Sequence, residues 1–154
     1  MGIAARLEAL GIVLPAPFPP AGSYVPAVLQ GDLLHVGGHG PIDGDEIVRG
    51  KVGADLDLAG GRRAARMTGL SLLATVQAEL GDLDRVRRIV KVFGMVNVAP
   101  GFDQMPAVID GCSDLFLEIF GEAGRHTRSA VGMASLPFGI AVEIELIAQV
   151  YAAS

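Results

Sequence analysis

The sequence predicts an α+β domain in which helices cover one face of a mixed β-sheet. Two helical patterns, from Asp57 to Leu80 and from Phe102 to Phe120, flank a long run of branched residues from Val86 to Val98. Strand-like runs precede the first helix and follow the second. The resulting order is two or three strands, a helix, a strand, a helix and two strands. This order is typical of helices laid on one side of a sheet.

The N-terminal segment is expected to form an arm ahead of the core. Ile3 to Leu10 has a short helical pattern that Gly11 can end. Four prolines between Leu14 and Gly22 predict an extended connector. We therefore expect an N-terminal helix and proline-rich arm over residues 1–22, and a single domain over residues 23–154.

The core is expected to begin with a strand pair. Tyr24 to Leu29 and Asp32 to Gly37 have strand composition and meet at Gln30-Gly31, and Glu46 to Arg49 predicts a short return strand. In the first long helix, Asp57 can cap the start and Gly81 the end.

The closing strands carry charge inside an apolar run. Two strands are predicted, from Ser129 to Leu136 and from Ala141 to Val150. Arg128 lies directly before the first, and Glu143 and Glu145 lie within the second. Because strand side chains alternate, the two glutamates share one face. The arginine and the acids could form a pocket for a small anionic ligand, or only an ion pair.

Composition indicates an acidic protein with a surplus of apolar residues. Of 154 residues 51% are hydrophobic and 19% charged, and the mean hydropathy is +0.47. Such a load in one small domain favours a homo-oligomer with apolar contacts. The formal net charge of −5 argues against a nucleic-acid partner.

The densest basic cluster contains Arg85, Arg87, Arg88 and Lys91. Regular alternation would place Arg87 and Lys91 on one face with Ile89, and Arg88 on the other. The cluster is therefore expected to be divided between two faces of the strand.

The single cysteine, Cys112, cannot form an internal disulfide, which favours a reducing cytoplasmic compartment. It falls in a helical pattern, where packing is the expected role. The N-terminus has no export signal pattern, and no apolar run reaches the roughly 20 residues of a membrane span. We expect a cytoplasmic protein without a membrane partner.

Several familiar chemistries do not fit the chain. Gly37, Gly38 and Gly40 do not open a helix, as a dinucleotide-binding loop requires. His35, His39 and His126 lack the spacing of a metal site, so we expect no metal and no cofactor. His35 is expected to be a strand residue, and His39 to line a pocket or a turn. Neither Ser129 nor Ser135 lies in the G-x-S-x-G motif of a serine hydrolase.

Arg128 leaves two interpretations open. It can be a structural arginine that pairs locally, or its planar guanidinium can bind a ligand carboxylate while Glu143 positions a water.

The motifs around these residues resemble those of a known family. The segments SYVPAVLQGDLLHVGGHGP, RIVKVFGMV, RSAVGMASLP and VEIELIA resemble the RidA family, also called the YjgF or endoribonuclease L-PSP family. The resemblance covers the core from Ser23 to Val150, and the N-terminal arm is similar to a longer branch of the family. It implies a sheet backed by two helices, similar to chorismate mutase of the bacillus type. It also implies a homotrimer whose sheets form a central barrel, with ligand sites between subunits.

The resemblance implies an activity and a set of site residues. The family's archetypal reaction is cofactor-independent hydrolysis of enamines and imines, such as 2-iminopropanoate, to a 2-keto acid and ammonia. Arg128 would then anchor the carboxylate, Glu143 would hold the water and Tyr24 would line the cleft. Gly37 and His39 stand where the family usually has a serine and a glutamine.

One further departure concerns Pro100, which replaces an asparagine associated with the ligand pocket. Carboxylate binding is therefore a safer expectation than any named substrate. The alternative is a trimeric protein that binds small carboxylates or 2-keto acids without turnover. A ribonuclease activity, suggested only by the family's older name, is disfavoured by the acidic charge.

Overall fold

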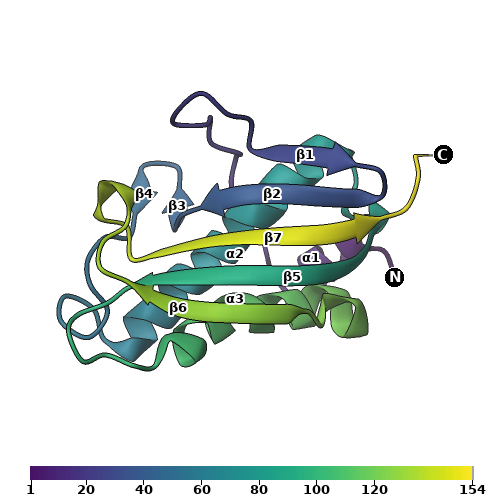
Figure 1. The fold of residues 1–154 in the computed structure, drawn as a ribbon. Helices are drawn as coiled ribbons and strands as arrows, with labels where there is room; N and C mark the ends of the chain where they lie inside the picture. The colour runs from purple at the N-terminus through teal and green to yellow at the C-terminus, as the bar shows by residue number, and fades with distance from the viewer. Residues whose placement is uncertain (154) are drawn as a thin grey trace.

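A computed structural model describes residues 1–153 and shows a five-stranded sheet covered on one face by helices (Figure 1). The strand order is β1 (Ala27–Gln30), β2 (Leu33–His39), β7 (Val142–Val150), β5 (Val86–Asn97) and β6 (Thr127–Met133). Only β5 and β6 pair in parallel, and the other neighbours are antiparallel. The predicted mixed sheet is confirmed.

Two long helices cover one face of this sheet, α2 (Leu58–Leu80) and α3 (Met105–Phe120). Smaller elements complete the fold: α1 (Ile3–Ala9), the hairpin of β3 (Ile42–Asp43) and β4 (Glu46–Ile47), and the 3₁₀ turns η1 (Leu83–Arg85), η2 (Gly121–Gly124) and η3 (Pro137–Gly139).

The ends of α2 follow the predicted capping. The Asp57 carboxylate accepts a hydrogen bond from the Gly60 N–H at 2.7 Å, and Gly81 ends the helix with a φ of 81°. This φ lies in the left-handed region, which glycine adopts without steric cost. The second helix begins at Met105 rather than at Phe102, because the Phe102 N–H closes a turn onto the Ala99 carbonyl.

The two faces of the sheet differ in burial. Side chains that face the helices, such as Val92, Val96 and Ile144, are fully buried. The opposite face carries residues that are only half-buried or exposed, among them Phe93 and Glu143. One apolar core thus lies between the sheet and the helices, and the other face of the sheet stays open in the single chain.

The predicted division of the basic cluster is wrong. The register of β5 against β7 shifts between Val86 and Arg88 and again between Ile89 and Lys91. These irregularities break the alternation of side chains, as β-bulges do. Ile89 is therefore fully buried, while Arg88 and Lys91 are both exposed.

The N-terminal arm packs onto the domain. The Ile3 N–H donates to the Asp84 carboxylate at 2.7 Å, and Arg6 Nε donates to the Glu118 carbonyl at 2.9 Å. Further along, Phe18 meets the His39 ring edge to face, with ring centroids 5.2 Å apart. None of the helices within residues 1–153 is long and apolar enough to cross a membrane.

Candidate functional site

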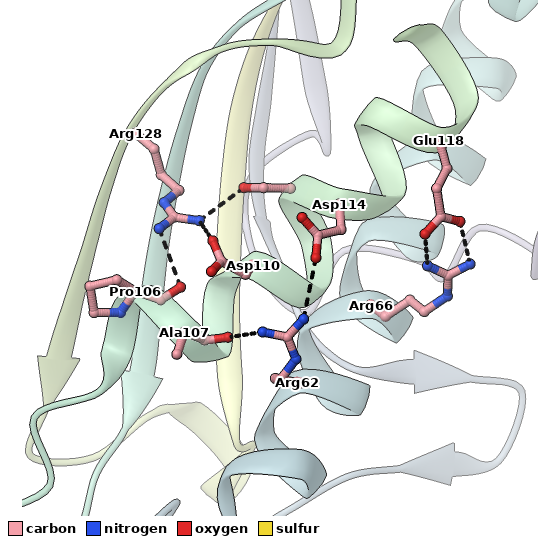
Figure 2. A network of polar contacts seen from close by, with 9 residues as sticks. Arg62, Arg66, Pro106, Ala107, Asp110, Asp114, Glu118 and Arg128 are labelled. Carbon is pink, nitrogen blue, oxygen red and sulfur yellow. Dashed lines mark hydrogen bonds and ion pairs between the residues drawn. The ribbon is translucent and has the colours of Figure 1, made fainter.

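Arg128 lies at the start of β6 and points toward α3. In the parallel ladder it stands beside Val92, whose side chain faces the helices. Its Nη1 donates to the Asp110 carboxylate at 2.7 Å and to Ser113 Oγ at 3.1 Å, while Nη2 donates to the Pro106 carbonyl at 3.2 Å (Figure 2). Arg128 therefore joins the edge strand to the helix below it.

The guanidinium keeps capacity for a ligand. An arginine has five N–H donors, and three hydrogen bonds from Arg128 are formed with the described residues. Its side chain is 20% exposed and that of Asp110 is 45% exposed. Two N–H donors of Arg128 thus remain without a protein partner within residues 1–153. The Asp110 carboxylate already partly balances the positive charge of the guanidinium.

Arg128 borders an open groove of about 910 Å³ where α3 passes into β6. The groove is also lined by Arg88 and Arg125 and by one acid, Glu122, which pairs with Arg125 at 3.1 Å. Arg88 reaches across to donate to the Arg125 carbonyl at 3.1 Å. The structure thus gathers Arg88, Arg125 and Arg128 around one groove, a grouping that was not predicted from the sequence.

A serine and a histidine in the same groove form a second polar group. Ser113 Oγ lies 2.9 Å from His126 Nε2, and His126 Nδ1 lies 2.7 Å from the Gly124 carbonyl. Burial lowers the pKa of His126, and the nearby Arg128 charge adds to this effect. In the sequence, His126 was a candidate only as a metal ligand and Ser113 was not a candidate, because the turn between α3 and β6 is what brings the two residues together.

Glu143 lies on the open face of the sheet, away from Arg128. Its neighbours Val142 and Ile144 point into the core, so the glutamate points the other way. Gly38 leaves room for it, because a Cβ at this position would collide with the Glu143 carboxylate. Burial, followed by the charge of Glu145, raises the pKa of Glu143. Within one chain, Arg128 and Glu143 therefore lie on opposite faces of the sheet.

The other predicted ligand-binding residues are also dispersed. Tyr24 is exposed ahead of β1, where its hydroxyl accepts a hydrogen bond from the Ala21 N–H at 3.1 Å. Gly37 lines a hollow of about 190 Å³ on the open face, together with Lys91, Phe93 and Glu145. Neither residue approaches the groove beside Arg128.

His39 is buried on the helix side of the sheet, with 3% of its surface exposed. Its Nδ1 lies 2.7 Å from the Gly37 carbonyl and its Nε2 lies 2.7 Å from Thr75 Oγ1 of α2. Burial lowers the pKa of His39, so the neutral ring is favoured. Direct contact between His39 and a ligand stays a prediction, and in this structure the ring ties β2 to α2.

The described residues offer neither a metal site nor an accessible cysteine. Within residues 1–153, no group of three or more His, Cys, Asp or Glu side chains is arranged to hold a metal ion. Cys112 is fully buried, and burial raises the pKa of its thiol well above its usual range. The site residues that remain are those of the groove and those of the open face.

Comparison with known proteins identifies the family. A family model described as "YjgF/chorismate_mutase-like, putative endoribonuclease" matches residues 4–150. The curated protein TCP17 of Trypanosoma cruzi is 47% identical over 149 residues, which cover 96% of this chain and 93% of that protein. The chain therefore belongs to the YjgF/endoribonuclease L-PSP family.

Solved structures support the same assignment. The crystal structure of Atu1372 of Agrobacterium tumefaciens, a protein of unknown function, is 44% identical with a TM-score of 0.90, over 97% of this chain and 92% of that one. A structure from Shewanella oneidensis is 32% identical with a TM-score of 0.94, over 97% of this chain and all of that one. TdcF of E. coli with bound serine is more distant, with 26% identity, a TM-score of 0.62 and coverage of 89% and 94%.

Proposed function

We propose that this protein hydrolyses small reactive 2-imino acids and their enamine tautomers, such as 2-iminopropanoate, to 2-keto acids and ammonia without a cofactor. Family membership supports the reaction type, and the serine bound in the related TdcF structure supports a small ligand that bears a carboxylate next to nitrogen.

The placement of Arg128 carries this proposal. It borders the groove, it is held rigidly by three hydrogen bonds, and it retains two N–H donors. A planar guanidinium binds a carboxylate through two parallel hydrogen bonds, which fixes the orientation of the ligand as well as its charge. The carboxylate end of a 2-imino acid is expected to bind here.

Glu143 is proposed to hold the hydrolytic water, and this role requires more than one subunit. Because Arg128 and Glu143 lie on opposite faces of one sheet, one chain cannot bring both to the same ligand. We propose a homotrimer in which Arg128 of one subunit and the equivalent of Glu143 in a neighbour border one cleft. The half-buried apolar side chains of the open face, such as Phe93, are consistent with burial between subunits.

A second candidate is a binding protein for small carboxylates or 2-keto acids without turnover. The ion pair between Arg128 and Asp110 favours it, because an arginine that is already positioned by its own chain can bind an anion without further catalytic groups. A ribonuclease activity is not proposed, since one groove with three arginines on a protein of net charge −5 is not a nucleic-acid surface.

Ammonia release from enzymatically generated 2-iminopropanoate tests the proposal. The wild type should accelerate release, and Arg128→Ala should lower kcat/KM by at least about 30-fold, because loss of a hydrogen-bonded charge pair costs about 2 kcal/mol or more. Arg63→Ala is the matched control, because Arg63 is an exposed arginine of α2 away from the groove. Light scattering of each variant should give the mass of three chains of 15.9 kDa.

Two results would contradict the hydrolase. One is no release above background across several amino-acid-derived imines, and the other is full activity of Arg128→Ala. Calorimetric binding of 2-keto acids that depends on Arg128, without any turnover, would favour the binding protein instead.

A further inference from the structure

We propose that Ser113 and His126 form a proton relay that acts on the ligand held by Arg128. This inference rests on the proposed hydrolysis and adds catalytic groups to it. It provides a base on the same side of the sheet as Arg128, within the same chain.

The hydrogen-bond partners fix the direction of each proton. The Gly124 carbonyl can only accept, so His126 Nδ1 must donate to it across 2.7 Å. In the neutral ring Nε2 is then an acceptor, and the Ser113 hydroxyl donates to it across 2.9 Å. Arg128 Nη1 donates to Ser113 Oγ at 3.1 Å, which completes a chain from the guanidinium to the imidazole.

Both residues border the groove in which the ligand is expected. Ser113 lies on the side of α3 that faces β6 and His126 lies just before β6, and both are among the residues that line the groove beside Arg128. Phe116 packs edge to face against the His126 ring, with centroids 6.0 Å apart. The ring is thus held in place between a packing contact and two hydrogen bonds.

The charged groups around His126 leave it as the base of this groove. They come from β5, η2, α3 and the start of β6: Arg88, Glu122, Asp110, Arg125 and Arg128. The acids among them are paired with Arg125 and Arg128, and the arginines stay protonated at all accessible pH. Burial and the neighbouring Arg128 charge lower the pKa of His126, so the imidazole is neutral near pH 7 and its Nε2 is available as a proton acceptor.

The relay carries two protons in turn, and each is first taken up and then released. Water adds its oxygen to the carbon of the protonated imine while the C=N electron pair moves to nitrogen. The water proton passes to Ser113 Oγ as the serine proton moves to His126 Nε2. The proton then returns through Ser113 to the amino nitrogen, and the C–N bond breaks with its electron pair on nitrogen. The hydroxyl proton enters the relay as the C=O bond forms, and ammonia finally takes it up. One water and one iminium ion thus give one keto group and one ammonium ion.

The test compares the pH dependence of kcat/KM for the wild type, Ser113→Ala and His126→Gln. The wild-type rate should fall at acidic pH as His126 becomes protonated. Both variants should lose at least about 100-fold near pH 7, the usual contribution of a positioned acid–base group, and His126→Gln should lose the acidic limb. Binding of pyruvate should stay within about threefold in both variants, because Arg128 keeps its hydrogen bonds to Asp110 and to the Pro106 carbonyl. Ser135→Ala is the matched control, since Ser135 is exposed and lies outside this groove.

The outcomes separate the relay from the proposed reaction. Wild-type turnover with an unchanged rate and pH profile in the folded variants would overturn the relay and leave the hydrolase standing. Absence of wild-type turnover would overturn both. If the variants unfold, nitrogen-15 NMR of the wild type decides, because the relay requires the neutral Nδ1–H form of His126 at pH 7. The other tautomer, or an imidazolium at that pH, would contradict it.

Discussion

At the scale of single residues, the charge of Arg128 is shared between its own chain and any ligand. The Asp110 carboxylate lies 2.7 Å from Nη1, and both side chains reach solvent. An ion pair of this partly exposed kind contributes on the order of 1 kcal/mol or less. An incoming carboxylate therefore meets an arginine whose orientation is fixed but whose charge is partly neutralised.

The variant Asp110→Asn tests this balance. Asparagine keeps an oxygen that can accept from Arg128 Nη1 and removes the negative charge, so 2-keto acids should bind about threefold to fivefold more tightly by calorimetry. Asp114→Asn is the control, because this acid pairs with Arg62 at 3.2 Å on the α2 side of α3 (Figure 2). Weaker binding in Asp110→Asn would mean that orientation by the charged carboxylate outweighs its competition with the ligand.

The sequence singles out Arg128 but not the residues that surround it. An arginine at the start of an apolar strand can be recognised from the sequence, because a charged residue is unusual at that position. Asp110 and Ser113 are ordinary helix residues, and they reach Arg128 only when α3 packs under β6. For Glu143, alternation along the strand predicts which neighbours share its face. Its separation from Arg128 is not predictable in this way, because it depends on the strand order of the sheet.

At the scale of elements, close approach of α2 and α3 determines how the helix layer packs. Gly111 of α3 lies against the Arg62 backbone carbonyl, and Gly69 of α2 lies against Leu115 and Cys112 of α3. The ion pairs Arg62–Asp114 and Arg66–Glu118 also bridge the helices, but all four side chains are at least 39% exposed. We therefore expect the small residues, rather than the ion pairs, to determine the stability of this contact.

Gly111→Ala should destabilise the protein despite a gain of about 1 kcal/mol in helix propensity. The new Cβ would collide with the Arg62 carbonyl, which belongs to the backbone and cannot rotate away. We expect a net loss of about 2 kcal/mol or more in the free energy of unfolding, measured by urea denaturation. Asp114→Ala, which only removes the exposed ion pair, should cost less than about 1 kcal/mol. The reverse ranking would show that the ion pairs dominate the contact.

Helix and strand positions were largely predictable because their signals are local. Asp57 and Gly81 mark the ends of α2 in the sequence, and the structure uses both as caps. The irregular register of β5 was not predictable, because it depends on pairing with β7, more than 50 residues later. The buried Ile89 and the exposed Lys91 follow from that pairing and not from alternation within the strand.

At the scale of the whole molecule, two histidines lie on the helix side of the sheet at distant points of the fold: His39 is buried and His126 is half-buried. His39 bonds to Thr75 and packs under Phe18 of the N-terminal arm, and His126 bonds to Ser113. Burial lowers the pKa of both rings, so the folded state favours their neutral forms. Protonation of either ring places a charge where burial disfavours it, and turns Nε2 from an acceptor into a donor toward the hydroxyl of Thr75 or Ser113.

The fold should therefore lose stability as the pH falls below about 6.5, the pKa of an unfolded histidine. Below that pH, His39 and His126 bind protons in the unfolded chain but stay neutral in the folded chain. The difference persists until the pH reaches the lower pKa values that the two rings have in the folded state. Glu143 acts in the opposite direction, because its raised pKa favours proton uptake by the folded state in the range above 4.5.

Urea denaturation should show that the free energy of unfolding declines as the pH is lowered from 8 to 5.5. The decline should be smaller in His39→Gln, because the glutamine amide can donate to the Gly37 carbonyl and accept from the Thr75 hydroxyl without titrating. His35→Gln, at an exposed position of β2, should decline like the wild type. An identical decline in His39→Gln and the wild type would show that the buried ring is not a source of the acid sensitivity.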